Sequence, residues 1–99
     1  MKLVLAFMLG CLPLLAGAQE KLPRDVARFV ENAQMCEHFA GEWDEHDKAR
    51  QREITQAVAS SCGQAQRQWK RLRVKYAGQP EILKVIDEHA NDAVRSFRK

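Results

Sequence analysis

Long apolar runs are missing from this 99-residue sequence after its first fifteen residues. A membrane-spanning helix needs about 20 consecutive apolar residues, so we expect no transmembrane segment in the mature chain. No stretch of useful length alternates apolar and polar residues, which argues against a sheet as the main architecture. Internal repeats and low-complexity segments are absent too. These absences leave a small helical domain as the fold to expect.

Catalytic motifs are also missing. The sequence has no Gly-rich phosphate loop, no nucleophile elbow and no pair of carboxylates at a known catalytic spacing. It has no Cys-x-x-Cys pair either, which argues against a redox site. We therefore predict that the protein is not an enzyme and that it uses no cofactor.

The first eighteen residues have the pattern of a secretory signal peptide. Lys2 precedes an apolar run over residues 3–15, and Ala16-Gly17-Ala18 supplies a small-x-small cleavage site. Leu9-Gly10-Cys11 faintly resembles a lipoprotein cleavage site, which we rank below ordinary cleavage. We expect a mature chain that begins at or near Gln19 and is periplasmic or secreted, in a bacterium.

Two cysteines, Cys36 and Cys62, remain in residues 19–99 after cleavage. Two cysteines allow one pairing, and an oxidising compartment permits it. The mature chain is long enough for one small domain, whose core is marginal, so a covalent bridge is useful there. The cysteines lie far apart in sequence, so we predict a structural disulfide between them.

Most of the remaining chain has apolar residues at helical spacing. The pattern predicts helices over about 23–40, 44 or 47 to 62, 64–76, and 80 or 81 to 97. Gly41 is the expected stop of the first helix, and Cys62-Gly63 the end of the second. Cys36 and Cys62 would then lie near helix ends that a strict antiparallel pair holds far apart. We therefore predict an all-α, compact, irregular bundle of about four helices, with orthogonal or oblique packing.

Charge is distributed in two blocks, although the net charge is only +3. Residues 31–47 contain no Lys or Arg, and their acids are Glu31, Glu37, Glu42, Asp44, Glu45 and Asp47. Residues 48–75 contain one acid, Glu53, and their bases are Lys48, Arg50, Arg52, Arg67, Lys70, Arg71, Arg73 and Lys75. This pattern predicts a surface with opposed acidic and basic regions.

The acidic block contains the first candidate site, for binding a protein partner. Its residues are Glu42, Trp43, Asp44, Glu45 and His46. An exposed Trp among charged neighbours is typical of an interface anchor with a polar rim. The alternative is that Trp43 folds back against Phe39, which we expect in the core, and only closes the corner between two helices.

A metal site is the alternative use of the same region. His38, Glu42 and His46 are spaced i, i+4 and i+8, and imidazole and carboxylate are metal ligands. Gly41 is expected to break any helix that would align them, and no recognised zinc spacing is present. We therefore rank a metal-binding protein second to a protein-binding module.

The second candidate site is a basic patch of Arg67, Lys70, Arg71 and Arg73. Such a face suits an anionic partner, namely nucleic acid, lipid headgroups or an acidic protein, but it is also an ordinary solvated helix surface. An exported location argues against nucleic acid. The partner that we expect is another exported or envelope protein.

Cys36-Glu37-His38-Phe39-Ala40-Gly41-Glu42 resembles a Cys-x-His-Phe-x-Gly-Glu signature. It is found in small, exported, uncharacterised bacterial proteins with a second cysteine downstream. The resemblance implies a helical, disulfide-containing periplasmic domain and carries no activity. The small stapled domain, the absence of catalytic motifs and the opposed acidic and basic surfaces favour a small periplasmic protein-binding or inhibitory module.

Overall fold

The structure, a computed structural model, describes residues 22–98. These residues contain no strand and form four helices: α2 (Arg24–Ala40), α3 (Lys48–Lys75), α4 (Pro80–His89) and α5 (Asp92–Ser96). The predicted all-α class is confirmed. Among these residues, no helix combines the length and the apolar character that crossing a membrane requires. The predicted signal peptide and the lipoprotein-like site lie outside the described residues.

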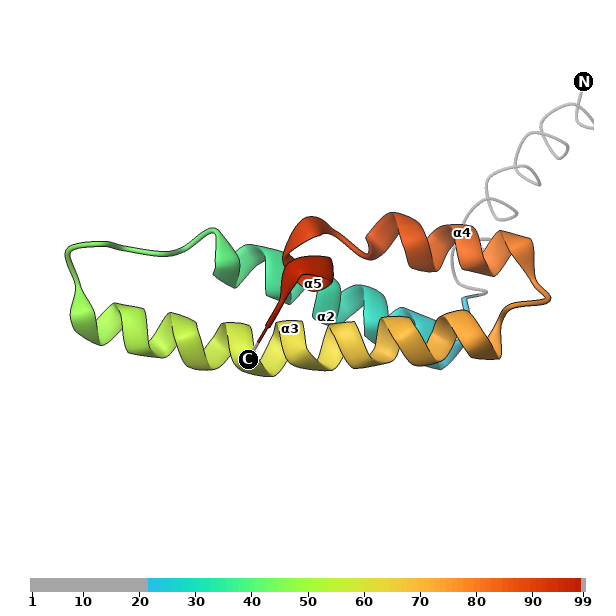
Figure 1. Cartoon of the computed structure of the whole chain (residues 1–99), viewed down its shortest axis with the longest axis horizontal. Coiled ribbons are helices and arrows are strands. Elements are labelled where there is room, and N and C mark those ends of the chain that lie inside the picture. The colour runs from blue at the N-terminus through green and yellow to red at the C-terminus, as the bar shows by residue number, and fades with distance from the viewer. Residues whose placement is uncertain (1–21, 99) are drawn as a thin grey trace, which may run out of the picture.

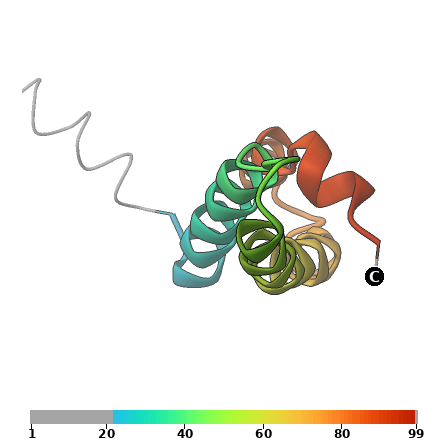
Figure 2. The same ribbon diagram turned by 90° about the vertical axis from the view of Figure 1, so that its left-hand side faces the viewer.

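The helices run back and forth along one long axis. Figure 1 shows α2 and α3 as an antiparallel hairpin, with α4 returning beside α3 and α5 lying across the middle. The end-on view in Figure 2 shows that α2 crosses α3 obliquely. Of the two expected arrangements, orthogonal and oblique, the structure has the oblique one, an antiparallel hairpin that α4 and α5 cover in part.

The longest helix, α3, corrects one sequence prediction. We expected separate helices to meet at Cys62-Gly63, but α3 continues through both residues. Gly41 does end α2 as predicted, with a negative φ, whereas Gly63 lies within the helix and does not have the positive φ that is common at helix ends. Gly63 is buried, and a Cβ there would lie 3.4 Å from the Phe97 ring, which is an ordinary packing distance. The prediction failed because a glycine inside a helix resembles a stop signal in the sequence.

The predicted disulfide joins α2 to the middle of α3. Cys36 and Cys62 are both buried, and their Cα atoms are 4.6 Å apart. Because α3 extends well past Cys62, its middle lies opposite Cys36, near the end of the antiparallel α2. The predicted pairing is confirmed, and the expected conflict between the bridge and an antiparallel pair disappears with the continuous helix.

The predicted helix over residues 80–97 is also divided differently. It stops at His89, and Asn91 begins α5 as its N-cap, since the Asn91 side chain accepts a hydrogen bond from the Val94 amide at 3.0 Å. The Asn91 amide group also donates to the Ala33 carbonyl at 3.0 Å. This capping turn buries Val94 completely. Asn favours N-caps, a signal that the apolar spacing alone does not reveal.

The core lies where α2, α3, α4 and α5 meet. Its largest fully buried side chains are Phe29, Ile86, Val26 and Val94 with the two cysteines. On α3, the Gln66 side chain donates to the carbonyls of Val94 and Phe97, both at 3.0 Å. These bonds satisfy carbonyls at the end of α5 that lack helical partners, and so hold the C-terminal segment against α3.

Polar contacts connect the start of α2 to the end of α3. Asp25 accepts hydrogen bonds from Lys75 at 2.6 Å and from the Tyr76 hydroxyl at 2.8 Å. The hydrogen bond and charge of Lys75 hold the pKa of Asp25 below its ordinary value, while burial opposes this shift. Asp25 therefore binds its proton less readily in the folded chain than in the unfolded chain.

This cluster predicts a pH dependence of stability. A carboxyl whose folded-state pKa is depressed contributes stability above its unfolded pKa and loses it as pH falls through the folded pKa. Asp25→Asn should therefore lower the melting temperature at pH 7, and the difference should shrink below about pH 4. Thermal melts of both proteins across this range check the prediction. An equal difference at all pH values would contradict it.

Candidate functional site

The acidic corner, residues 41–47, joins α2 to α3 and is exposed throughout. Asp47 caps α3, its side chain accepting from the Arg50 amide at 3.0 Å. Glu42 pairs with Arg50 at 3.3 Å, and Gln51 donates to the Asp44 carbonyl at 2.8 Å. These bonds run from the first turns of α3 to the corner, so the corner has a defined shape despite its exposure.

Trp43 lies in this corner with 52% of its surface exposed. Phe39, which we expected in the core, is half-buried, lies outside the core cluster, and packs edge-on against His38 with ring centroids 5.2 Å apart. No aromatic contact between Phe39 and Trp43 is present among the described residues. Trp43 is therefore not closed against Phe39, and about half of it remains available for other contacts.

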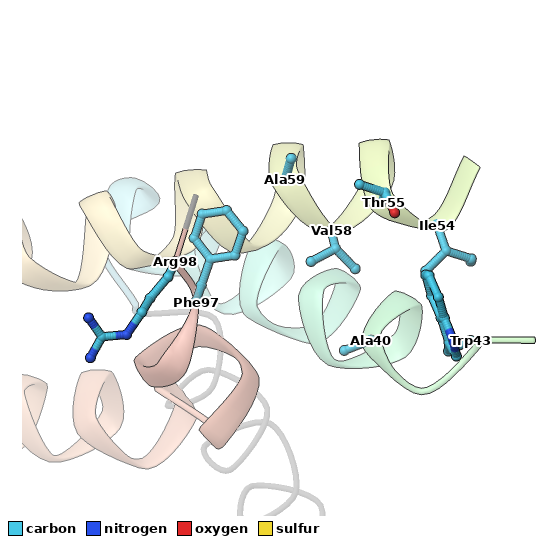
Figure 3. A pocket seen from close by; sticks show the side chains of 8 residues that line it. All are labelled: Ala40, Trp43, Ile54, Thr55, Val58, Ala59, Phe97 and Arg98. Carbon is cyan, nitrogen blue, oxygen red and sulfur yellow. The ribbon is translucent and has the colours of Figure 1, made fainter. Parts of the chain in front are cut away.

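An open apolar groove lies beside Trp43. It has a volume of about 610 Å³ and runs from the acidic corner to the C-terminal segment (Figure 3). The residues that line it are Ala40, Trp43, Ile54, Thr55, Val58, Ala59, Phe97 and Arg98. Two regions far apart in sequence thus meet along the N-terminal half of α3.

The groove exists because α3 is longer than the helices that cover it. In Figure 1, α4 and α5 lie beside the C-terminal half of α3 and leave the end of the hairpin near the acidic corner open. Ile54 is 2% exposed and forms part of the groove wall. The groove is a feature that sequence reasoning missed, because it requires the position of Phe97 relative to the first turns of α3.

The groove has charged groups near both ends. Arg98 lines it beside Phe97, and the corner that carries Trp43 also carries Glu42, Asp44 and Glu45. Glu42 is already paired with Arg50, which leaves Asp44 and Glu45 without an ion pair among residues 22–98. This arrangement suits a ligand that has an apolar face and a basic group next to that face.

The histidines do not assemble a metal site in the described part of the chain. His38 is in the last turn of α2, whereas Glu42 and His46 lie beyond the end of that helix. Among residues 22–98, no three His, Cys, Asp or Glu side chains are grouped so that they would hold a metal ion. The i, i+4, i+8 spacing would align the three side chains only on a continuous helix, and α2 stops at Ala40.

The predicted basic patch is divided by the fold. Arg73 turns toward α4 and pairs with Asp87 at 3.1 Å. Arg67, Lys70 and Arg71 are exposed on α3. Arg28, on α2, lines a depression of about 360 Å³ together with Arg71. Among residues 22–98, Arg67, Lys70 and Arg71 thus have no ion pair, unlike Arg73, and Arg28 adds a cation from α2 that spacing within α3 cannot reveal.

Comparison with family models, curated proteins and solved structures found no match for this chain.

Proposed function

We propose that the protein is a small exported binding module, periplasmic or secreted, that docks an exported or envelope protein through the apolar groove. The observation that carries the proposal is a half-exposed Trp43 at one end of an open apolar groove of about 610 Å³. Aromatic side chains at the edge of a pocket are frequent binding hot spots. The groove is formed without any rearrangement of the described residues.

The chemistry of the groove defines the segment of the partner that fits it. Side chains such as Ile54, Val58 and Phe97 offer apolar contact. Asp44 and Glu45 lie in the corner that bounds one end and are exposed. We infer a partner segment with apolar side chains on one face, such as an amphipathic helix, and with Lys or Arg directed toward the acidic corner.

Export is a separate part of the proposal. It is supported by the signal-like pattern of residues 1–18 and by the buried Cys36–Cys62 bridge, since disulfides persist in oxidising compartments. Cytosolic protein that retains Met1 and has reduced cysteines would contradict it.

Trp43→Ala tests the groove. Because Trp43 is half-exposed, the substitution should cost about 1–2 kcal/mol of the free energy of unfolding, less than the about 3–5 kcal/mol of a buried Trp. The affinity for the partner should fall by about tenfold or more, as for a hot-spot residue. Denaturant unfolding measures the first value, and capture from a periplasmic extract, followed by affinity measurement with the captured protein, gives the second.

Met35→Ala is the matched control, because Met35 is 46% exposed and does not line the groove. It should leave affinity within about twofold, since residues outside an interface contribute little to binding. A still-folded Trp43→Ala protein that binds the partner as wild type would exclude the groove as the docking site.

A further inference from the structure

A second surface, independent of the groove, lies at the opposite end of the hairpin. There α2 and α3 face each other through successive polar side-chain pairs. Asp25 bonds to Lys75 at 2.6 Å, and two helical turns farther along α2 the Asn32 amide donates to Gln68 at 2.9 Å. Between these complementary pairs lie two side chains of the same charge, Arg28 and Arg71, which line the same depression.

Neither arginine has a carboxylate partner within residues 22–98. Asp25 is the only acid that lines this depression. Its two oxygens already accept from Lys75, the Tyr76 hydroxyl and the Val26 amide. The depression therefore has positive charge that no side chain of its own neutralises.

A second depression, of about 450 Å³, extends this surface toward the start of α2. It shares Asp25, Arg28 and Lys75 with the first and adds Arg24. The two depressions thus bring four cations around one carboxylate that is already bonded. The N-terminus of α2 adds the positive end of its dipole at the same place, since Pro23 provides no side-chain cap.

The exposed face of α3 continues the cationic surface. Arg67, Lys70 and Arg71 are exposed there. Val74 lies one turn beyond Lys70 and Arg71 and is 80% exposed. An apolar side chain surrounded by cations matches the interfacial region of a bilayer, where basic groups meet phosphates and apolar groups reach the acyl boundary.

We propose that this cationic face, Arg24, Arg28, Arg67, Lys70, Arg71 and Val74, docks on a membrane surface that contains anionic phospholipid. Arg28 and Arg71 together hold a lipid phosphate, because a guanidinium donates two parallel hydrogen bonds to phosphate oxygens. The acidic corner lies at the opposite end of the hairpin (Figure 1), so docking leaves the Trp43 end of the apolar groove away from the lipid.

Sedimentation of the chain 19–99 with vesicles tests this proposal. The wild type should bind vesicles of mixed phosphatidylcholine and phosphatidylglycerol, and pure phosphatidylcholine only weakly. Added salt should weaken the binding, since it screens exposed charges. Arg28→Gln/Arg71→Gln should bind the anionic vesicles about tenfold or more weakly, because each basic group near an anionic surface adds to affinity.

Lys48→Gln/Arg52→Gln is the matched control. It removes the same charge from exposed positions of α3 near the acidic corner, and should change vesicle binding by less than about threefold, because charge far from the surface is screened. The Arg28→Gln/Arg71→Gln variant should melt no lower than the wild type, since it relieves repulsion between like charges.

Three results would overturn the proposal. The first is a wild type that ignores phosphatidylglycerol vesicles. The second is an equal loss in both double variants, which would reduce the effect to net charge. The third is a wild type that binds soluble polyglutamate through Arg28 and Arg71 but does not bind vesicles. That result would assign the face to an acidic protein.

Discussion

Replacing both Cys36 and Cys62 with alanine should lower the free energy of unfolding by about 3–4 kcal/mol. The bridge spans 26 residues of sequence, and closing a loop of that length restricts the unfolded chain. A domain of this size has a total stability of roughly 4–12 kcal/mol. Both cysteines are also buried in the core, so the contacts around them are lost together with the covalent link.

Denaturant unfolding of the double variant and of the reduced wild type measures this loss of free energy. In thermal melts of the same two proteins, the melting temperature should fall by roughly 10–30 °C. Reduction breaks the bridge but preserves both sulfur atoms, whereas alanine also leaves a cavity. Equal losses of stability in the two proteins would therefore assign the loss to the missing bridge and not to the cavity. A reduced protein as stable as the oxidised one would show that packing, and not the bridge, holds α2 against α3.

The substitution Phe29→Ala should cost about 3–5 kcal/mol of the free energy of unfolding. Phe29 is fully buried and belongs to the core cluster that joins α2, α3 and α4. Removing its ring leaves a cavity that the surrounding helices fill only in part. In so small a domain, this loss should leave part of the protein unfolded at 37 °C.

Phe39→Ala is the matched control, since it makes the same change on the same helix. Phe39 is half-buried and lies outside the core cluster, so the loss should be about 1 kcal/mol. Urea unfolding of the two variants in parallel gives the comparison. Equal costs would mean that Phe39 contributes to the core as much as Phe29 does.

Local patterns were sufficient to predict several features of the fold. Six residues of α2 share one predicted stripe at helical spacing. Four of them, Val26, Phe29, Ala33 and Cys36, are buried, whereas Val30 is half-buried and Ala40 is exposed. The pairing of Cys36 with Cys62 followed from cysteine number and compartment. Each of these features depends on residues within one helix or on a simple count.

Features that depend on tertiary packing were predicted less well. Gly63 was interpreted as a helix stop, but α3 continues through it, and the Phe97 ring packs beside it. The helix stops at His89 and Asn91 caps the start of the next one, although the apolar spacing continues past both residues. A hydrophobic pattern alone does not distinguish a continuous helix from one that is interrupted by a cap.

For the candidate sites too, the local features were predicted better than those that depend on tertiary packing. The sequence identified Trp43 and its acidic neighbours as a possible anchor and rim, and the structure places Trp43 half-exposed at the end of a groove. The groove itself required Phe97 and Ile54 to be brought together across many residues. The basic patch needed Arg28 from α2 and lost Arg73 to Asp87 for the same reason.

Photo-cross-linking in the exporting cell tests the central claim, that the groove docks a partner, most directly. A photoreactive residue at Thr55 lies in the groove, whereas one at the neighbouring exposed Gln56 does not line it. The account predicts one exported or envelope protein cross-linked from position 55, little or none from position 56, and loss of the adduct when Trp43→Ala is added. Equal adducts from both positions, or an adduct that persists without Trp43, would contradict it.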